Sequence, residues 1–114
     1  MSAIALLTDH YQYYLYARPT DMRKSFDGLC GTVQNELGRT VADRDIFIFL
    51  NKEGTHIKLL LREADGFTLL YRRLHKGRFL LPKIEPGTKA LQLNSTELLS
   101  LLARLQLHRS RYRA

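Results

Sequence analysis

The sequence predicts an α+β fold in which helices pack against an antiparallel sheet. Residues 11–16 and 46–50 are rich in the aromatic and β-branched types that favour strands. From Phe26 to Leu37, apolar residues recur at the three- and four-residue spacing of one helix face. A capping-box pair, Asn94 and Glu97, precedes a leucine-rich run that predicts a C-terminal helix.

The first predicted elements are a strand and a helix. The strand over residues 11–16 has apolar side chains on both faces and ends before Pro19, because proline cannot donate to a sheet. Ser25 is placed to cap the helix that follows, and Gly38 to close it in the left-handed conformation. Cys30 lies on the apolar face of this helix, so we expect a core residue rather than a reactive thiol.

A hairpin is predicted next. Residues 46–50 are apolar on both faces, which is typical of a central strand. Residues 51–54 form a turn, and residues 56–61 continue as the second strand.

The following segment is predicted as a helix over residues 67–74. Its apolar residues fit helical spacing, Asp65 is placed to cap it, and Gly77 lies where a helix C-cap belongs. The β-favouring types at residues 67–69 make a strand the alternative. A short strand is then predicted at residues 78–81.

A length of 114 residues predicts a single domain. We expect its core at about residues 11–82, a loop at 83–93, and a C-terminal helix with a basic tail at 94–114. The predicted order of elements, with the helix over 67–74, is that of a ferredoxin-like βαββαβ sandwich plus a C-terminal helix.

Basic charge is concentrated in the C-terminal half of the chain. Residues 1–65 carry 8 basic and 9 acidic side chains, whereas residues 66–114 carry 10 basic and 2 acidic ones. Such asymmetry favours a polyanionic partner, and DNA is the expected one. Solubility alone is the other explanation for this charge.

Two groups of cations are the candidate nucleic-acid-binding residues. Arg72, Arg73, Lys76 and Arg78 lie within a short stretch without any acid, on what we predict to be the solvent side of the helix. Arg23 and Lys24 flank the start of the first helix, where backbone amides favour anions. Such cations suit phosphate contacts, although a solvated surface also explains them.

No catalytic, metal or cofactor site is predicted. Helix caps and turns account for the candidate carboxylates, and the four histidines lack metal-ligand spacing. There is no glycine-rich phosphate loop. We therefore expect no cofactor and no enzymatic activity.

A cytoplasmic location is predicted. The apolar run near the start of the chain is too short for a signal peptide, and no run is long enough to span a membrane. Cys30 is the only cysteine, so an internal disulfide is excluded.

Several motifs resemble one family. Residues 22–29 (MRKSFDGL), 71–74 (YRRL) and 76–79 (KGRF), followed by Pro82, are similar to the TnpB-type accessory proteins of the bacterial insertion sequence 66 family. The resemblance runs from about Tyr14 to Pro82. The matching motif positions are Arg23, Lys24, Ser25, Phe26, Asp27, Gly28, Arg73, Gly77, Arg78 and Phe79.

The resemblance implies a non-catalytic accessory factor for transposition, encoded beside a separate transposase. It implies packing roles for Phe26 and Phe79, a backbone requirement at Gly77, and DNA contacts for Arg23, Lys24, Arg73 and Arg78. DNA and the transposase of the same element are the expected partners, no membrane is expected, and a homo-oligomer is compatible with the sequence.

The alternative is a protein–protein adaptor that holds the transposase through the C-terminal helix without binding DNA. An RNA-binding module is a weaker alternative, because the sequence lacks the paired aromatic signature of such sheets.

Overall fold

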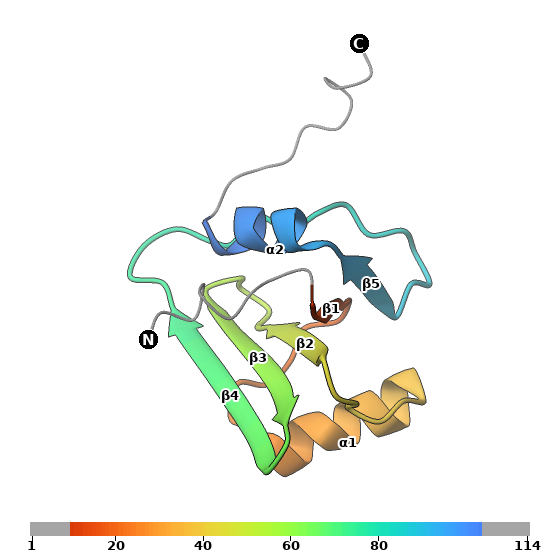
Figure 1. The fold of residues 1–114 in the computed structure, drawn as a ribbon. Helices are drawn as coiled ribbons and strands as arrows, with labels where there is room; N and C mark the ends of the chain where they lie inside the picture. The colour runs from red at the N-terminus through yellow and green to blue at the C-terminus, as the bar shows by residue number, and fades with distance from the viewer. Residues whose placement is uncertain (1–9, 104–114) are drawn as a thin grey trace.

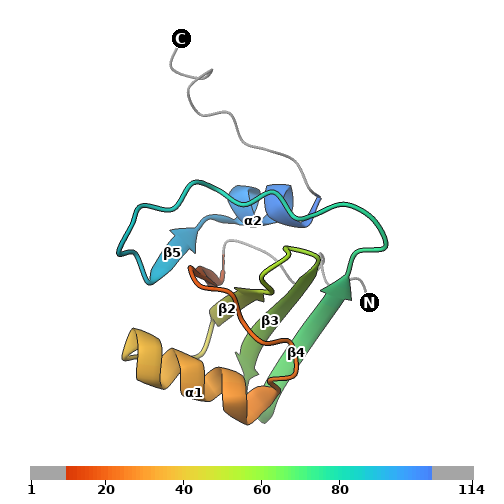
Figure 2. The same cartoon turned by 180° about the vertical axis from the view of Figure 1, so that it is seen from behind.

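The computed structural model describes residues 10–103, which form a five-stranded sheet with a helix on each face (Figures 1 and 2). The predicted α+β class is confirmed. In chain order the elements are β1 (Gln12–Tyr16), α1 (Phe26–Leu37), β2 (Asp45–Leu50), β3 (His56–Glu63), β4 (Gly66–Arg73), β5 (Ala90–Leu93) and α2 (Ser95–Leu102).

The sheet is mixed rather than wholly antiparallel. Its strand order is β4-β3-β2-β1-β5, so β4 and β5 form the two edges. β1 and β2 run parallel, and α1 is the crossover between them; the other neighbouring pairs are antiparallel. β2 lies in the centre and is buried along its whole length, as its apolar sequence predicted.

Each face of the sheet has its own apolar core. On one face, Ile48 and Leu59 pack with Leu98, Leu101 and Leu102 of α2. On the other, Phe47, Phe49 and Leu60 pack with Leu29 and Val33 of α1. The central strands are therefore buried on both faces of the sheet.

The prediction of a helix over residues 67–74 is wrong, because this segment is strand β4. It pairs with β3 along its full length, from Glu63 opposite Gly66 to His56 opposite Arg73. The apolar residues of this segment fit the two-residue period of a strand as well as the period of a helix. A turn of only two residues after β3 brings the chain back directly alongside β3. The ladder of hydrogen bonds therefore decides the conformation.

Two further predictions fail downstream. Residues 78–81 are not a strand, although Phe79 is buried in the core beneath α2. Instead, the edge strand β5 lies inside the segment predicted as a loop at 83–93, where Leu91 and Leu93 pair with β1. With four strands following α1, the element order is not that of a ferredoxin-like sandwich.

The helix ends mostly follow the sequence signals. Asn94 and Glu97 form the predicted capping box of α2. Gly38 closes α1 with φ 63°, whereas the Ser25 side chain makes no capping hydrogen bond. The predicted basic tail lies outside the described residues from position 104 onward.

Candidate nucleic-acid interface

At one end of the sheet, the β2–β3 turn and the segment that follows β4 lie against each other. After β4, residues 74–79 fold over the β2–β3 turn: the amide of Leu74 donates to the carbonyl of Thr55 at 2.9 Å, and that of Phe79 donates to the carbonyl of Gly54 at 2.8 Å. This end lies at the top of the sheet in Figure 1. Residues that are distant in sequence therefore become neighbours here.

The β2–β3 turn is held by the side chain of Asn51. Its Oδ1 accepts from the amides of Thr55 at 2.9 Å and His56 at 3.0 Å. Gly54 adopts φ 73°, and a Cβ there would lie 3.7 Å from the Cβ of Arg78. The turn therefore holds in place the segment of residues 74–79, which carries Lys76 and Arg78.

The basic end of the sheet consists of Lys52, Arg73, Lys76 and Arg78. All four side chains are exposed. None of them forms a salt bridge with a residue in the described range 10–103. Gly77, between the last two, has φ 78°, in accordance with the predicted backbone requirement. Glu53 lies in the same turn as Lys52, but its Oε1 accepts from the side-chain amide of Asn51 at 3.3 Å rather than forming a salt bridge with one of these cations.

Arg72 is separated from this group. Neighbouring residues of a strand point to opposite faces, so Arg72 and Arg73 diverge. The Nη1 of Arg72 donates to the carbonyl of Leu102 at 2.9 Å, which ties β4 to the end of α2. The predicted single row of Arg72, Arg73 and Lys76 on one helix face is therefore not what the structure has.

Arg23 and Lys24 are also engaged within the protein. Arg23 forms a salt bridge of 2.7 Å with Asp21. The side-chain and backbone hydrogen bonds that Arg23 donates to the Asp21 carboxylate lower its pKa to about 2. The Nζ of Lys24 donates to the hydroxyl of Thr32 in α1 at 3.0 Å. Both side chains remain exposed, but their charges are less available than those of the basic end.

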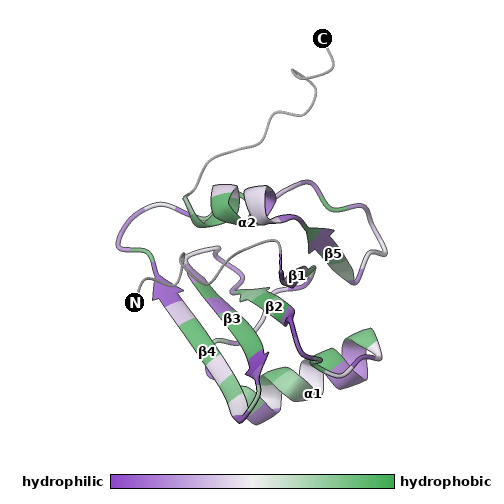
Figure 3. Cartoon of the chain, viewed as in Figure 1, coloured by the Kyte–Doolittle hydropathy of each residue, from purple (hydrophilic) through white to green (hydrophobic). Residues whose placement is uncertain are grey.

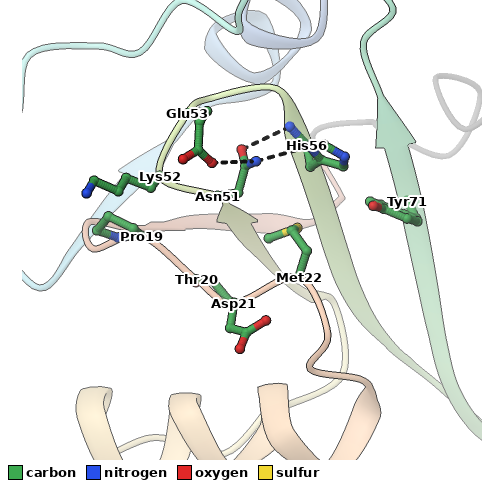
Figure 4. Close-up of a pocket in the computed structure, with 9 residues that line it drawn as sticks. All are labelled: Pro19, Thr20, Asp21, Met22, Asn51, Lys52, Glu53, His56 and Tyr71. Carbon is green, nitrogen blue, oxygen red and sulfur yellow. Dashed lines mark hydrogen bonds between the residues drawn. The ribbon is translucent and has the colours of Figure 1, made fainter.

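A pocket of about 410 Å³ lies next to the basic end, between the β2–β3 turn and the segment that leads into α1 (Figure 4). Its lining residues are Pro19, Thr20, Asp21, Met22, Asn51, Lys52, Glu53, His56 and Tyr71. The rings of His56 and Tyr71 are stacked with their centroids 6.0 Å apart. Tyr71, one of the apolar residues assigned to the predicted helix over 67–74, is 55% exposed on the edge strand β4.

Lys58 lies on β3 next to two residues of this pocket, Met22 and Tyr71, and is only 8% exposed. Its Nζ donates to the carbonyls of Met22 at 2.7 Å and Lys24 at 2.8 Å, and lies 5.0 Å from the centroid of the Tyr71 ring. A buried ammonium group is thus satisfied by two carbonyl groups and an aromatic face. Lys58 fixes the segment before α1 against β3.

Sequence reasoning missed several residues of this region. Lys52 was assigned only to a turn, and His56 and Lys58 only to the strand that follows it, with no binding role. Once 66–73 is recognised as a strand, pairing places Lys58 opposite Tyr71 and His56 opposite Arg73. Phe26, expected to pack, is 40% exposed. No cluster of metal-ligating side chains occurs among the described residues.

Comparison with known families gives a decisive match. The model of the IS66 Orf2-like proteins matches residues 11–112, nearly the whole chain. The chain belongs to the IS66 Orf2-like family. This membership confirms the predicted family and associates the protein with the transposition of an insertion sequence.

A relative of this IS66 Orf2-like protein is the uncharacterized protein y4hO of Sinorhizobium fredii, which is 35% identical over 72 residues. The aligned part covers 63% of this chain and 63% of the relative's length. No solved structure matches the chain. Within residues 10–103, none of the helices has the length and apolar character needed to cross a bilayer.

Proposed function

We propose that this protein is a non-catalytic accessory factor of transposition that binds duplex DNA through the basic end of the sheet. The observation that carries the proposal is the position of Lys52, Lys76 and Arg78, which are exposed, lie on adjoining segments and have no described carboxylate as a salt-bridge partner. Such cations bind DNA phosphates and release counterions.

Glu53 in the β2–β3 turn and Asp21, which pairs with Arg23, lie beside this surface, whereas another group of acidic residues lies far from it. Asp43, Glu63 and Asp65 lie at the opposite end of β2, β3 and β4, where Asp43 also pairs with Arg62 at 3.8 Å. A polyanion approaching the basic end therefore does not meet these carboxylates at close range. Phosphate contacts alone set affinity and orientation, so we expect weak dependence on DNA sequence.

An adaptor that binds the transposase is the second candidate, but not through the apolar face of α2. Leu98, Leu101 and Leu102 are buried in the core of this protein. Leu80 and Leu81, which are 43% and 50% exposed, follow the basic end directly and offer an apolar surface instead. The residues of the C-terminal helix predicted beyond Ala103 lie outside the described range.

The first test is a salt titration of DNA binding. We expect the parent protein to bind a duplex from the end of the element with an affinity that falls steeply as salt rises. The double variant K76A/R78A should bind more weakly, and the slope of log K against log salt should flatten by about 1.8, since each lost phosphate contact contributes about 0.9.

The matched control is R39A/R44A, which removes the same charge from exposed residues that precede β2, at the opposite end of the sheet. Its slope should stay within experimental error of the parent. Equal slopes for K76A/R78A and the parent would refute the DNA surface. A parent that does not bind DNA but co-purifies with the transposase would establish the adaptor role instead.

A further inference from the structure

The outer edge of β4 is free of any described strand. Figures 1 and 2 both show β4 at the margin of the sheet, with β3 on its inner side only. In an antiparallel pair, every second residue of a strand directs its backbone N–H and C=O groups to the neighbouring strand. Because the amide of Leu74 donates to the carbonyl of Thr55, the backbone groups of Arg72 and Leu70 also point to β3. The backbone groups of Phe67, Leu69, Tyr71 and Arg73 therefore point outward.

The same residues carry an exposed apolar strip. Their side chains share the sheet face that α1 covers only partly: Phe67 is 43% exposed, Tyr71 is 55% exposed, and Leu69 between them is half-buried. In Figure 3 the tip of β4 is coloured as hydrophilic, whereas much of the strand is not. A free strand edge beside exposed apolar side chains is a ready template for another strand.

We propose that two copies of the chain associate by antiparallel pairing of β4 with β4, around a two-fold axis at Leu69. In this register Leu69 faces its own copy, and Phe67 faces Tyr71 of the second copy. The two sheets then continue into one. The contact is closed, because each copy supplies the same strand to the other.

Charge complementarity selects this register. In the proposed register, Asp65, the turn residue that precedes β4, lies beside Arg73 of the second copy. The two-fold axis repeats the pair, so the contact contains two such ion pairs. The two nearest alternative registers slide one β4 strand along the other by two residues, in either direction, because only every second residue has outward-pointing backbone groups. One places Phe67 opposite Arg73, and the other places Asp65 opposite Tyr71. Both of these registers lose the ion pairs between Asp65 and Arg73.

The dimer is compatible with the basic end as a DNA surface. Arg73 is used in the contact between copies, whereas Lys52, Lys76 and Arg78 lie beyond the paired strands. The association does not depend on DNA, so it stands or falls separately from the proposed function.

The test is the mass of the protein in solution, measured by size-exclusion chromatography with light scattering in the absence of DNA. We expect the parent to be a dimer. D65R and R73D should each be monomeric, because like charges then face each other at both ends of the contact. The charge-swapped variant D65R/R73D should recover the dimer. Circular dichroism checks that each variant is folded.

A crosslink tests the register. In the C30S background, L69C should form a disulfide between copies on oxidation, because the two Cα atoms are expected about 5.5 Å apart in a hydrogen-bonded pair. T68C, one residue away and on the other face, should not. A monomeric parent, dimeric single charge variants, or equal crosslinking of L69C and T68C would each overturn the proposal.

Discussion

Thr20 is a buried polar residue whose hydroxyl group has no hydrogen-bond partner among the described residues. The side chain is 6% exposed, while the Thr20 amide donates to the carbonyl of Leu50 at 2.8 Å. Because an unsatisfied buried hydroxyl costs free energy, T20V should raise the free energy of unfolding by about 1 kcal/mol, measured by urea denaturation.

T20S is the matched control for this prediction. It keeps the hydroxyl group and removes the methyl group, so it should lower the free energy of unfolding through lost packing. A T20V variant less stable than the parent would mean that the Thr20 hydroxyl has a partner that the prediction ignores.

Individual residues were predictable where a local rule decides their role. Gly38, Asn94 and Glu97 act at helix ends as their types and spacing predicted. Cys30 is half-buried on α1, where burial raises the pKa of its thiol, in keeping with a packing role. Lys58 was not predictable, because nothing local shows that the carbonyls of residues 22 and 24 meet its ammonium group.

At the scale of elements, Lys58 connects β3 to the entry of α1. K58M keeps the length and apolar stem of the side chain but removes both hydrogen bonds to the carbonyls of Met22 and Lys24. Hydrogen bonds from charged groups contribute about 1.5–3 kcal/mol, so we expect K58M to lower the free energy of unfolding by roughly 2–3 kcal/mol.

The matched variant is K52M, which makes the same substitution at an exposed turn residue and should leave stability within about 0.5 kcal/mol of the parent. Chemical denaturation monitored by circular dichroism measures both. If K58M unfolds like K52M, Lys58 does not hold the segment before α1.

β4 and β5 show why elements at the sheet edges are harder to predict than central ones. β2 is apolar on both faces, so its sequence alone indicates a central strand. β4 is buried on neither face for much of its length, and its sparse apolar residues fit two periods. β5 has only four residues and depends on its pairing with β1. Their conformation is set by long-range pairing rather than by local preference.

For the whole molecule, the sequence predicted where basic charge is concentrated but not how it is arranged in space. Treating residues 67–74 as a helix placed Arg72 and Arg73 side by side. The strand separates them and brings Lys52 from another turn to the basic end. Asp21 also lies at this end and neutralises Arg23.

The Asp21–Arg23 pair makes a prediction about DNA affinity. The hydrogen bonds that Arg23 donates lower the pKa of Asp21 to about 2, so the carboxylate is ionised at neutral pH. D21N keeps the Oδ1 atom that accepts from the Arg23 amide at 2.9 Å, but removes the charge. Arg23 then becomes available to a phosphate. DNA affinity should rise, and the salt slope should steepen by about 0.9.

D43N is the control that separates this local effect from net charge. It removes one negative charge at the far end of the sheet, where Asp43 pairs with Arg62. Because interactions between exposed charges are screened beyond about 10 Å at 0.1 M salt, D43N should leave the slope unchanged. Equal effects of D21N and D43N in the same fluorescence titration would show that net charge, rather than the basic end, controls DNA binding.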